Sequence, residues 1–319
     1  SQAVFNQIAT TLNTKYFNKL QDQKELARGF ANANAASAQN GTMLGYQNYD
    51  LFAVMVGTQL SAAVPGYTSN KAASSLKSTT TKGDAYVGVA QSPFVVNTGL
   101  NSSFLIKGLY LSAKFGGFNY STTVSNVDLK YSQKMFGLGA NYDMFDGFNL
   151  IAGLLRWRGL SFGTGIIYTQ NDAKISFINI PDQQINISGT TNVARVYDIK
   201  VKYNSKSNAL VIPFDLSTSI QALWVLNLGV GAGVDIITPN SKIKVSSDAK
   251  TQITGFSGSG NINVIASNTK NKPKFKDRVA PRLSAAVGLN IAPVKIDLNA
   301  LLYPQTKTAA VGLSAGVVW

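Results

Sequence analysis

The chain has 319 residues, a formal net charge of +14, and neither cysteine nor histidine. These absences exclude disulfides, thiolate metal sites and every catalytic arrangement in this chain that needs a cysteine or histidine side chain. Mean hydropathy is +0.04, and no run of about 18 apolar residues could cross a bilayer as a helix. We therefore expect no enzyme activity, no cofactor and no metal site.

The positive charges lie mainly in segments rich in serine, threonine and asparagine. A nucleic-acid-binding protein would cluster them on a helix or beside stacking aromatic residues, so nucleic acid is not an expected partner. Two interpretations stay open: solvated loops that keep the chain soluble during export, and attraction of anionic solutes or acidic lipid headgroups. The sequence opens at Ser1 without a methionine, which we interpret as a mature chain whose signal peptide has been removed.

Residues 3–36 predict the one helical segment. Its apolar residues recur every four positions, at Val4, Ile8, Leu12, Tyr16 and Leu20. Small residues dominate positions 26–36, and small residues permit close backbone packing. Two placements of residues 1–48 stay open: a plug in a barrel lumen, with Lys24, Glu25 and Arg28 paired to charges on the wall, or a periplasmic extension.

From residue 49 onward, bulky apolar residues alternate with small or polar ones at a period of two, which predicts strands. The predicted strands cover 51–64, 85–91, 103–115, 127–144, 157–170, 173–180, 184–204, 209–221, 225–237, 281–291, 294–303 and 309–319. The pattern thus predicts an all-β fold for 49–319, an antiparallel transmembrane β-barrel of about 12 strands. Ten strands are the alternative if 85–91 and 173–180 do not span. Residues 65–84 and 238–278 are predicted as external loops, and 148–155 as a short interfacial helix.

Charged residues are interspersed with glycine, serine and asparagine on the face opposite the bulky residues. That pattern is expected for a wet or plugged lumen, whereas a soluble β-sandwich would turn its bulky face inward. The charged residues assigned to the lumen are Lys114, Asp143, Asp198, Lys200, Lys202, Asp215, Asp235, Arg282, Lys295 and Asp297. Their mixed signs have two interpretations: a ladder of salt bridges, or a solute path biased toward anions.

Tryptophan and arginine mark the expected edge of the membrane. An indole ring favours the headgroup level, where a guanidinium can meet phosphate. We predict membrane-interface anchors at Arg156, Trp157, Arg158, Trp224 and Trp319. A ligand site at the Arg-Trp-Arg cluster is the alternative.

The last strand carries the strongest motif. Ala309, Val311, Leu313, Ala315, Val317 and Trp319 form one face, and the other face is mostly small. This segment resembles the C-terminal signal strand of bacterial outer-membrane β-barrels, which ends on an aromatic residue. The resemblance implies an integral outer-membrane location, with the barrel-assembly machinery, membrane lipid including lipopolysaccharide, and other envelope proteins as partners.

Among such barrels, a short N-terminal helical plug loosely resembles the fatty-acid transporter family. The Asn-Pro-Ala element of that family is missing here, and twelve strands would be fewer than its usual number. We therefore expect a passive porin-like channel or solute-uptake barrel. The alternative is a non-conducting barrel that acts as an adhesin, a receptor or part of an envelope complex.

Overall fold

The computed structural model describes residues 23–42, 49–64, 88–125, 127–151, 154–180, 182–186, 193–253, 259–270 and 278–319. The elements are helix α2 (Gln23–Ser37) and strands β1 (Phe52–Ala63), β2 (Gly88–Asn101), β3 (Leu109–Val124), β4 (Val127–Ile151), β5 (Leu155–Ile180), β6 (Gln183–Asn186), β7 (Val193–Ala222), β8 (Leu226–Ile253), β9 (Ser259–Lys270), β10 (Val279–Ile291), β11 (Val294–Tyr303) and β12 (Thr308–Val318). No helix in this part of the chain is long and apolar enough to cross a membrane.

Ten of these strands form a closed antiparallel ring in the order β1-β2-β3-β4-β5-β7-β8-β10-β11-β12, and β12 pairs back with β1. The ring closes from Ala53 opposite Val318 to Ala63 opposite Thr308. The predicted barrel is therefore confirmed, with ten strands in the ring. Predicted strands 157–170 and 173–180 are both part of β5. Residues 193–204 of predicted strand 184–204 are part of β7, as is 209–221, whereas residues 184–186 belong to β6.

An apolar belt surrounds the ring. In β11, Val294, Ile296, Leu298 and Leu302 are exposed, while the intervening Lys295, Asp297 and Asn299 are buried. A closed ring satisfies the backbone hydrogen bonds of its strands, and a ring whose outward residues are apolar is suited to hydrocarbon. The protein is an integral outer-membrane β-barrel.

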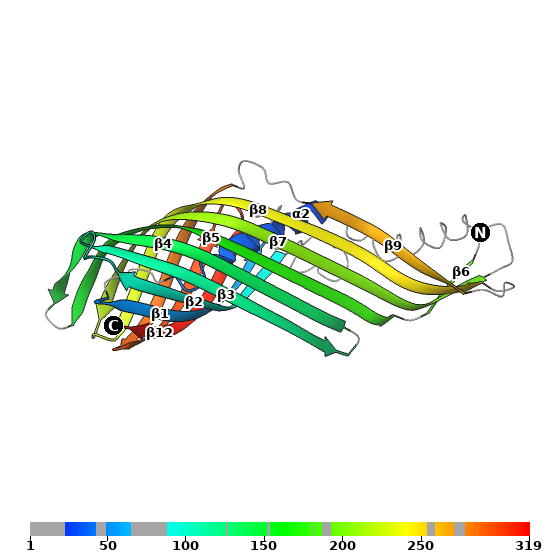
Figure 1. The fold of residues 1–319 in the computed structure, drawn as a ribbon, viewed down its shortest axis with the longest axis horizontal. Coiled ribbons are helices and arrows are strands. Elements are labelled where there is room, and N and C mark those ends of the chain that lie inside the picture. Colours follow the sequence, from blue (N-terminus) through cyan, green and yellow to red (C-terminus); the bar gives the residue numbers. More distant parts are fainter. Residues whose placement is uncertain are drawn as a thin grey trace.

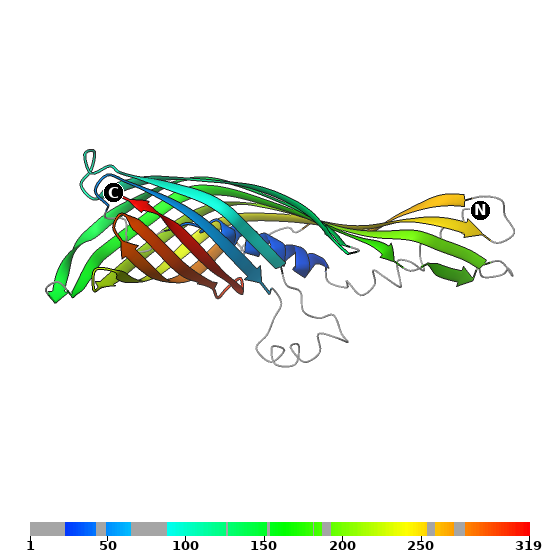
Figure 2. The same cartoon turned by 90° about the horizontal axis from the view of Figure 1, so that it is seen from below.

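The wall of the barrel is much taller on one side (Figures 1 and 2). Pairing of β2 with β3 stops at Val95 and Gly116, and pairing of β8 with β10 stops at Ile236 and Val279. Past these points the remaining strands continue as an open curved sheet, which we call the extension. It comprises residues 117–124, 127–134, 170–180, 193–209 and 238–253, with β6 and β9.

Two sequence-based predictions are wrong, one in the extension and one at the opposite end of the barrel. Much of the predicted loop 238–278 is strand, because β8 continues to Ile253 and pairs with β9. The predicted interfacial helix at 148–155 is instead the end of β4 and the start of β5, with Phe148 opposite Trp157. The apolar residues of that stretch did not distinguish a short helix from a strand.

The two ends of the barrel differ. At the end that holds Trp319, the connections 102–108, 223–225 and 292–293 are short. The extension lies at the opposite end (Figure 1). In outer-membrane barrels the short turns are periplasmic and the longer connections are external. By this rule we assign the extension to the external side and the end with Trp319 to the periplasmic side.

Candidate functional site

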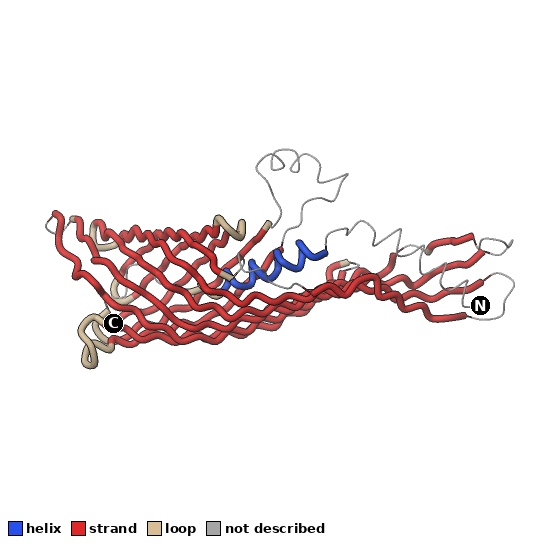
Figure 3. Tube along the Cα trace, turned by 90° about the horizontal axis from the view of Figure 1, so that it is seen from above, coloured by secondary structure: helices blue, strands red, loops and turns tan. Residues whose placement is uncertain are grey.

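Residues 23–42 run along the inner side of the sheet from the extension into the ring, and we call them the luminal segment. They contact strands that are far apart in the ring: Asn34 donates to Thr169 O of β5 (3.2 Å), and Asn40 donates to Gly57 O of β1 (3.2 Å). Residues 31–41 are all buried. Figure 3 shows α2 along the inner side of the sheet, where the ring meets the extension. Of the predicted helix 3–36, residues 3–22 lie outside the described residues.

Amides hold the turn after the helix. Gln59 of β1 donates to Ala36 O (2.9 Å), and Asn97 of β2 donates to Gly41 O (2.8 Å). Asn40 donates to Ser92 O (2.8 Å). The bonds from Gln59 and Asn97 reach carbonyl groups at and just beyond the helix C-terminus, where a helix leaves acceptors over. Ala36 O also accepts from Gln39 N (3.2 Å). Gly41, in the turn after the helix, has a φ of +70°, a left-handed conformation that glycine adopts without strain.

A cluster of buried charges lies next to this turn. Asp235 accepts hydrogen bonds from Tyr303 Oη (2.8 Å) and Gln39 Nε2 (3.3 Å), and Arg282 Nη1 lies 3.3 Å from it. Arg282 also forms an ion pair with Asp215. The side chains of Arg282 and Asp235 are 2% and 1% exposed. An unpaired charge is costly to bury, so Arg282, Asp215 and Asp235 each depend on the others to remain charged inside the barrel.

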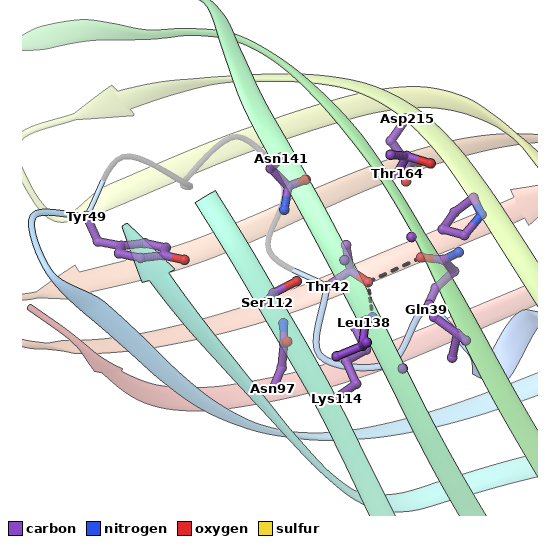
Figure 4. A pocket seen from close by; sticks show the side chains of 15 residues that line it. Gln39, Thr42, Tyr49, Asn97, Ser112, Lys114, Leu138, Asn141, Thr164 and Asp215 are labelled. Atoms are coloured by element: carbon purple, nitrogen blue, oxygen red, sulfur yellow. Dashed lines mark hydrogen bonds between the residues drawn. The ribbon is translucent and has the colours of Figure 1, made fainter. Parts of the chain in front are cut away.

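Lys114 of β3 is a second charged residue of the wall that contacts the luminal segment. Its Nζ donates to Ala38 O (3.2 Å) and to Thr42 Oγ1 (2.6 Å). Figure 4 shows Lys114, Thr42 and Gln39 around a small pocket that Asp215 also lines. The pocket has a volume of about 50 Å³, so it offers room for only a few water molecules.

A glycine brings the helix close to the wall. A Cβ at Gly88 of β2 would overlap the backbone of Gly29 and Phe30. Backbone atoms cannot rotate away as a side chain can, so this position requires glycine while the helix is in place. Phe30 also meets Tyr203 of β7, with ring centroids 6.3 Å apart.

Seven of the ten predicted lumen residues belong to the ring and face its interior. Besides Lys114, Asp215, Asp235 and Arg282, these are Asp143, Lys295 and Asp297. Ser161 Oγ donates to Asp143 (2.8 Å). Lys24 and Glu25 lie in the helix, but their side chains are outside the described residues, and Arg28 is partly buried in it.

Asp198, Lys200 and Lys202 are in the extension and do not line the lumen, which corrects their assignment. Lys202 pairs with Asp248, and Asp198 pairs with Lys250 at 3.0 Å. The sequence-based prediction assigned the two faces of this strand the wrong way round: Ile199 is buried, and the lysines lie on the outer side. On the extension, apolar residues point inward and polar residues point out. Alternation alone cannot distinguish this arrangement from that of the lipid-facing belt.

The predicted anchors gather at the periplasmic end. Trp224 and Trp319 are 69% and 61% exposed. Trp157 packs edge-on against Phe148 and donates to Thr218 Oγ1 (2.7 Å). Arg156 is exposed, whereas Arg158 donates to Gln221 Oε1 (3.3 Å).

Sequence reasoning missed the amides and hydroxyls that make most contacts with the luminal segment. Asn34 lies in the stretch 26–36 that was noted only for its small residues, and Gln39 and Asn40 lie beyond the predicted helix and carried no prediction. The available signal was the run of amide side chains at the end of a helix that was itself expected to be enclosed by a barrel wall. Within the described ranges, no group of three potential metal ligands comes together.

The sequence matches the family model described as Lsa36-like over residues 1–319. The chain belongs to the Lsa36-like family. No curated protein matches this member of the family.

Solved structures similar to this member include the translocator domain of autotransporter NalP from Neisseria meningitidis, at 9% identity and a TM-score of 0.36, covering 85% of this chain and 90% of that one. A Pseudomonas aeruginosa FadL homologue matches at 9% identity and a TM-score of 0.31, covering 91% and 98%. The attachment invasion locus protein Ail of Yersinia pestis matches at 8% identity and a TM-score of 0.29, covering 86% and 98%. At such identities and scores, no function transfers from these proteins.

Proposed function

We propose that this protein is a passive outer-membrane channel or solute-uptake barrel whose lumen is closed by the luminal segment. The observation that carries the proposal is the set of bonds from opposite sides of the ring to residues 34–42. A barrel that conducts no solute could fill its lumen with side chains of its own wall. In this barrel the wall side chains leave room for a separate segment of the chain. Solute passage then requires that segment to move.

A preference for anions is the finer part of the proposal, and it rests on the net charge of +14. The charged residues that line the ring are nearly balanced in sign, with Lys114, Arg282 and Lys295 facing four aspartates. We therefore expect a weak preference, measurable as a small shift in reversal potential across a salt gradient.

A disulfide lock tests the closure directly. Ser37 Oγ and Thr169 Oγ1 are 3.3 Å apart, and the chain has no cysteine of its own. In the variant Ser37→Cys/Thr169→Cys, a disulfide needs only a small approach of the two side chains. In planar bilayers, we expect no channel steps from the oxidised protein and wild-type steps after reduction.

Two controls complete the experiment. Ser37→Cys alone should behave as wild type in both redox states. Deletion of residues 1–40 should give larger and more frequent steps. If this deletion produces no steps above background, the protein does not conduct, and the non-conducting surface-binding barrel is the better description.

A further inference from the structure

The outer face of the extension continues the lipid-facing surface of the barrel, but its residues are different. The belt ends at a row of paired residues, Phe115, Phe136, Tyr168 and Leu210, on strands β3, β4, β5 and β7. All four side chains are exposed, and the rings of Phe115 and Phe136 have centroids 5.5 Å apart. The same strands, on the same face, then turn polar.

The three rows beyond this edge contain six lysines, and their number rises from row to row. The first row holds Lys134, the second holds Lys206 directly opposite Lys242, and the third holds Lys130 directly opposite Lys174, with Lys244 on the same row. We call these six residues the lysine patch. All are exposed except Lys244, which is partly buried.

Aspartates on this face neutralise little of the patch. Asp172 lies 3.7 Å from Lys206, Asp248 pairs with Lys202 outside the patch, and Asp128 accepts a hydrogen bond from Thr123 (2.8 Å). Two lysines directly opposite each other on neighbouring strands repel, which destabilises the sheet. The patch has two such pairs, so a bound anion would relieve a repulsion built into the fold.

The patch begins at the height of the headgroup zone of a bilayer and extends above it. Two residues advance a strand by about 7 Å, so with a tilt of about 45° each row rises about 5 Å above the last. The three rows then lie about 5, 10 and 15 Å above the aromatic edge. The polar zone of one leaflet is about 5–8 Å thick for an ordinary phospholipid. A lipid with a larger headgroup would reach all three rows.

A groove lies across the second and third rows. It has a volume of about 340 Å³, and its lining includes Asn119, Ser121, Lys130, Ser132, Asp172 and Lys174. Two ammonium groups and two hydroxyl groups around one groove are donors suited to phosphate oxygens. The one carboxylate in the lining, Asp172, is paired with Lys206 (3.7 Å).

We propose that the lysine patch binds the phosphate groups of a membrane lipid whose acyl chains pack on the aromatic edge below. Because the patch covers three rows, the lipid that fits is a glycolipid with more than one phosphate, of the lipid A type. This lipid site goes beyond the proposed channel function and does not depend on conduction.

The test compares two variants that remove the same charge. Lys130→Gln/Lys174→Gln removes the pair at the groove, and Lys200→Gln/Lys250→Gln removes two exposed lysines farther along the extension. The full chain in detergent is titrated with bis-phosphorylated lipid A, and bound lipid is counted by native mass spectrometry. We expect the first variant to bind at least tenfold more weakly than wild type and the second to change less than twofold.

Further arms make each outcome decisive. Lys206→Gln/Lys242→Gln should also weaken binding, and circular dichroism should show wild-type strand content for every variant. Dephosphorylated lipid A should bind at least tenfold more weakly than the bis-phosphorylated form. Equal losses in the groove and control variants, equal binding of the dephosphorylated lipid, or full displacement by soluble dextran sulfate would each overturn the proposal.

Discussion

Arg282 offers the most informative single perturbation of the lumen. It pairs with Asp215 and Asp235, and its side chain is 2% exposed. Substitution by methionine keeps most of the volume and removes the charge. Both carboxylates then lose their cation, although Asp235 keeps its bonds to Tyr303 and Gln39.

Removing one partner of a buried ion pair typically costs about 3–5 kcal/mol. We expect the lower end of that range for Arg282→Met, about 3 kcal/mol, because Asp215 retains 18% exposure and Asp235 retains two donors. The triple variant with Asp215→Asn and Asp235→Asn should recover most of this loss, since replacing all members of a buried ion pair is often neutral. With a urea dependence of about 2 kcal/mol per molar, the single variant shifts the midpoint by about 1.5 M.

Urea unfolding in detergent, followed by tryptophan fluorescence and by heat-dependent gel mobility, measures these differences. Arg195→Met is the matched control, because Arg195 donates to Asp182 at 3.0 Å but the two side chains are 62% and 42% exposed. An exposed pair should contribute less than about 1 kcal/mol. A loss below about 1 kcal/mol for Arg282→Met, or a triple variant no more stable than the single one, would refute the reasoning.

Three shorter predictions follow from other contacts. Gly88→Val should displace the luminal segment and raise conductance in planar bilayers, whereas Gly117→Val, where a Cβ meets nothing within 4 Å, should not; equal effects would contradict the packing argument. The hydrogen bond and charge of Lys250 lower the pKa of Asp198, so Lys250→Gln should raise that pKa in a carboxyl-carbon NMR titration. Stability from this pair should be present above the usual aspartate pKa and fall as the pH drops through the lowered value. Deletion of Trp319 should reduce the yield of heat-modifiable barrel, because its backbone closes the ring against residues 51 and 52; an unchanged yield would argue against that role.

The strands near the C-terminus could be predicted almost residue by residue. β10, β11 and β12 alternate between lipid and lumen along their whole length, and 281–291, 294–303 and 309–319 match them within about two residues at either end. Such strands contain one pattern from end to end, because each crosses a single environment. Period two then gives both the element and its faces.

The long strands were harder to predict from the sequence, because each passes through two environments, the membrane and the extension. In β7, Leu210 and Phe214 face lipid, while Ile199 near the other end is buried on the inner side. The apolar face therefore switches sides along one strand, and the bulge between Tyr197 and Lys200 shifts the register as well. A sequence interpretation that assigns apolar residues to lipid throughout divides such a strand in two and inverts one half.

The contacts of the luminal segment could not be predicted for a different reason. The expected partners were charges, Lys24, Glu25 and Arg28 against wall aspartates. The described contacts are mostly amide to carbonyl, as for Gln59 and Asn97. Any buried amide can serve any carbonyl group, so the sequence contains no pairing signal comparable to opposite charges.

The covalent path limits how this barrel can open. Thr42 is the last described residue of the luminal segment, and Tyr49, which packs against Tyr110 at a centroid distance of 5.0 Å, is seven residues later. The backbone N–H of Leu51 donates a hydrogen bond to Trp319 O (2.7 Å), which attaches the chain to the periplasmic rim there. Seven residues span at most about 25 Å. The turn at Gln39 and Asn40 therefore stays tethered to that rim while β1 stays paired, and the tether limits how far the segment can move from it. In the proposed channel, opening breaks the bonds of Lys114, Asp235 and Asn97 to the segment. Mutations of Lys114 and Asn97 should therefore change gating, since neither residue is an ion-pair partner of Arg282 in the wall.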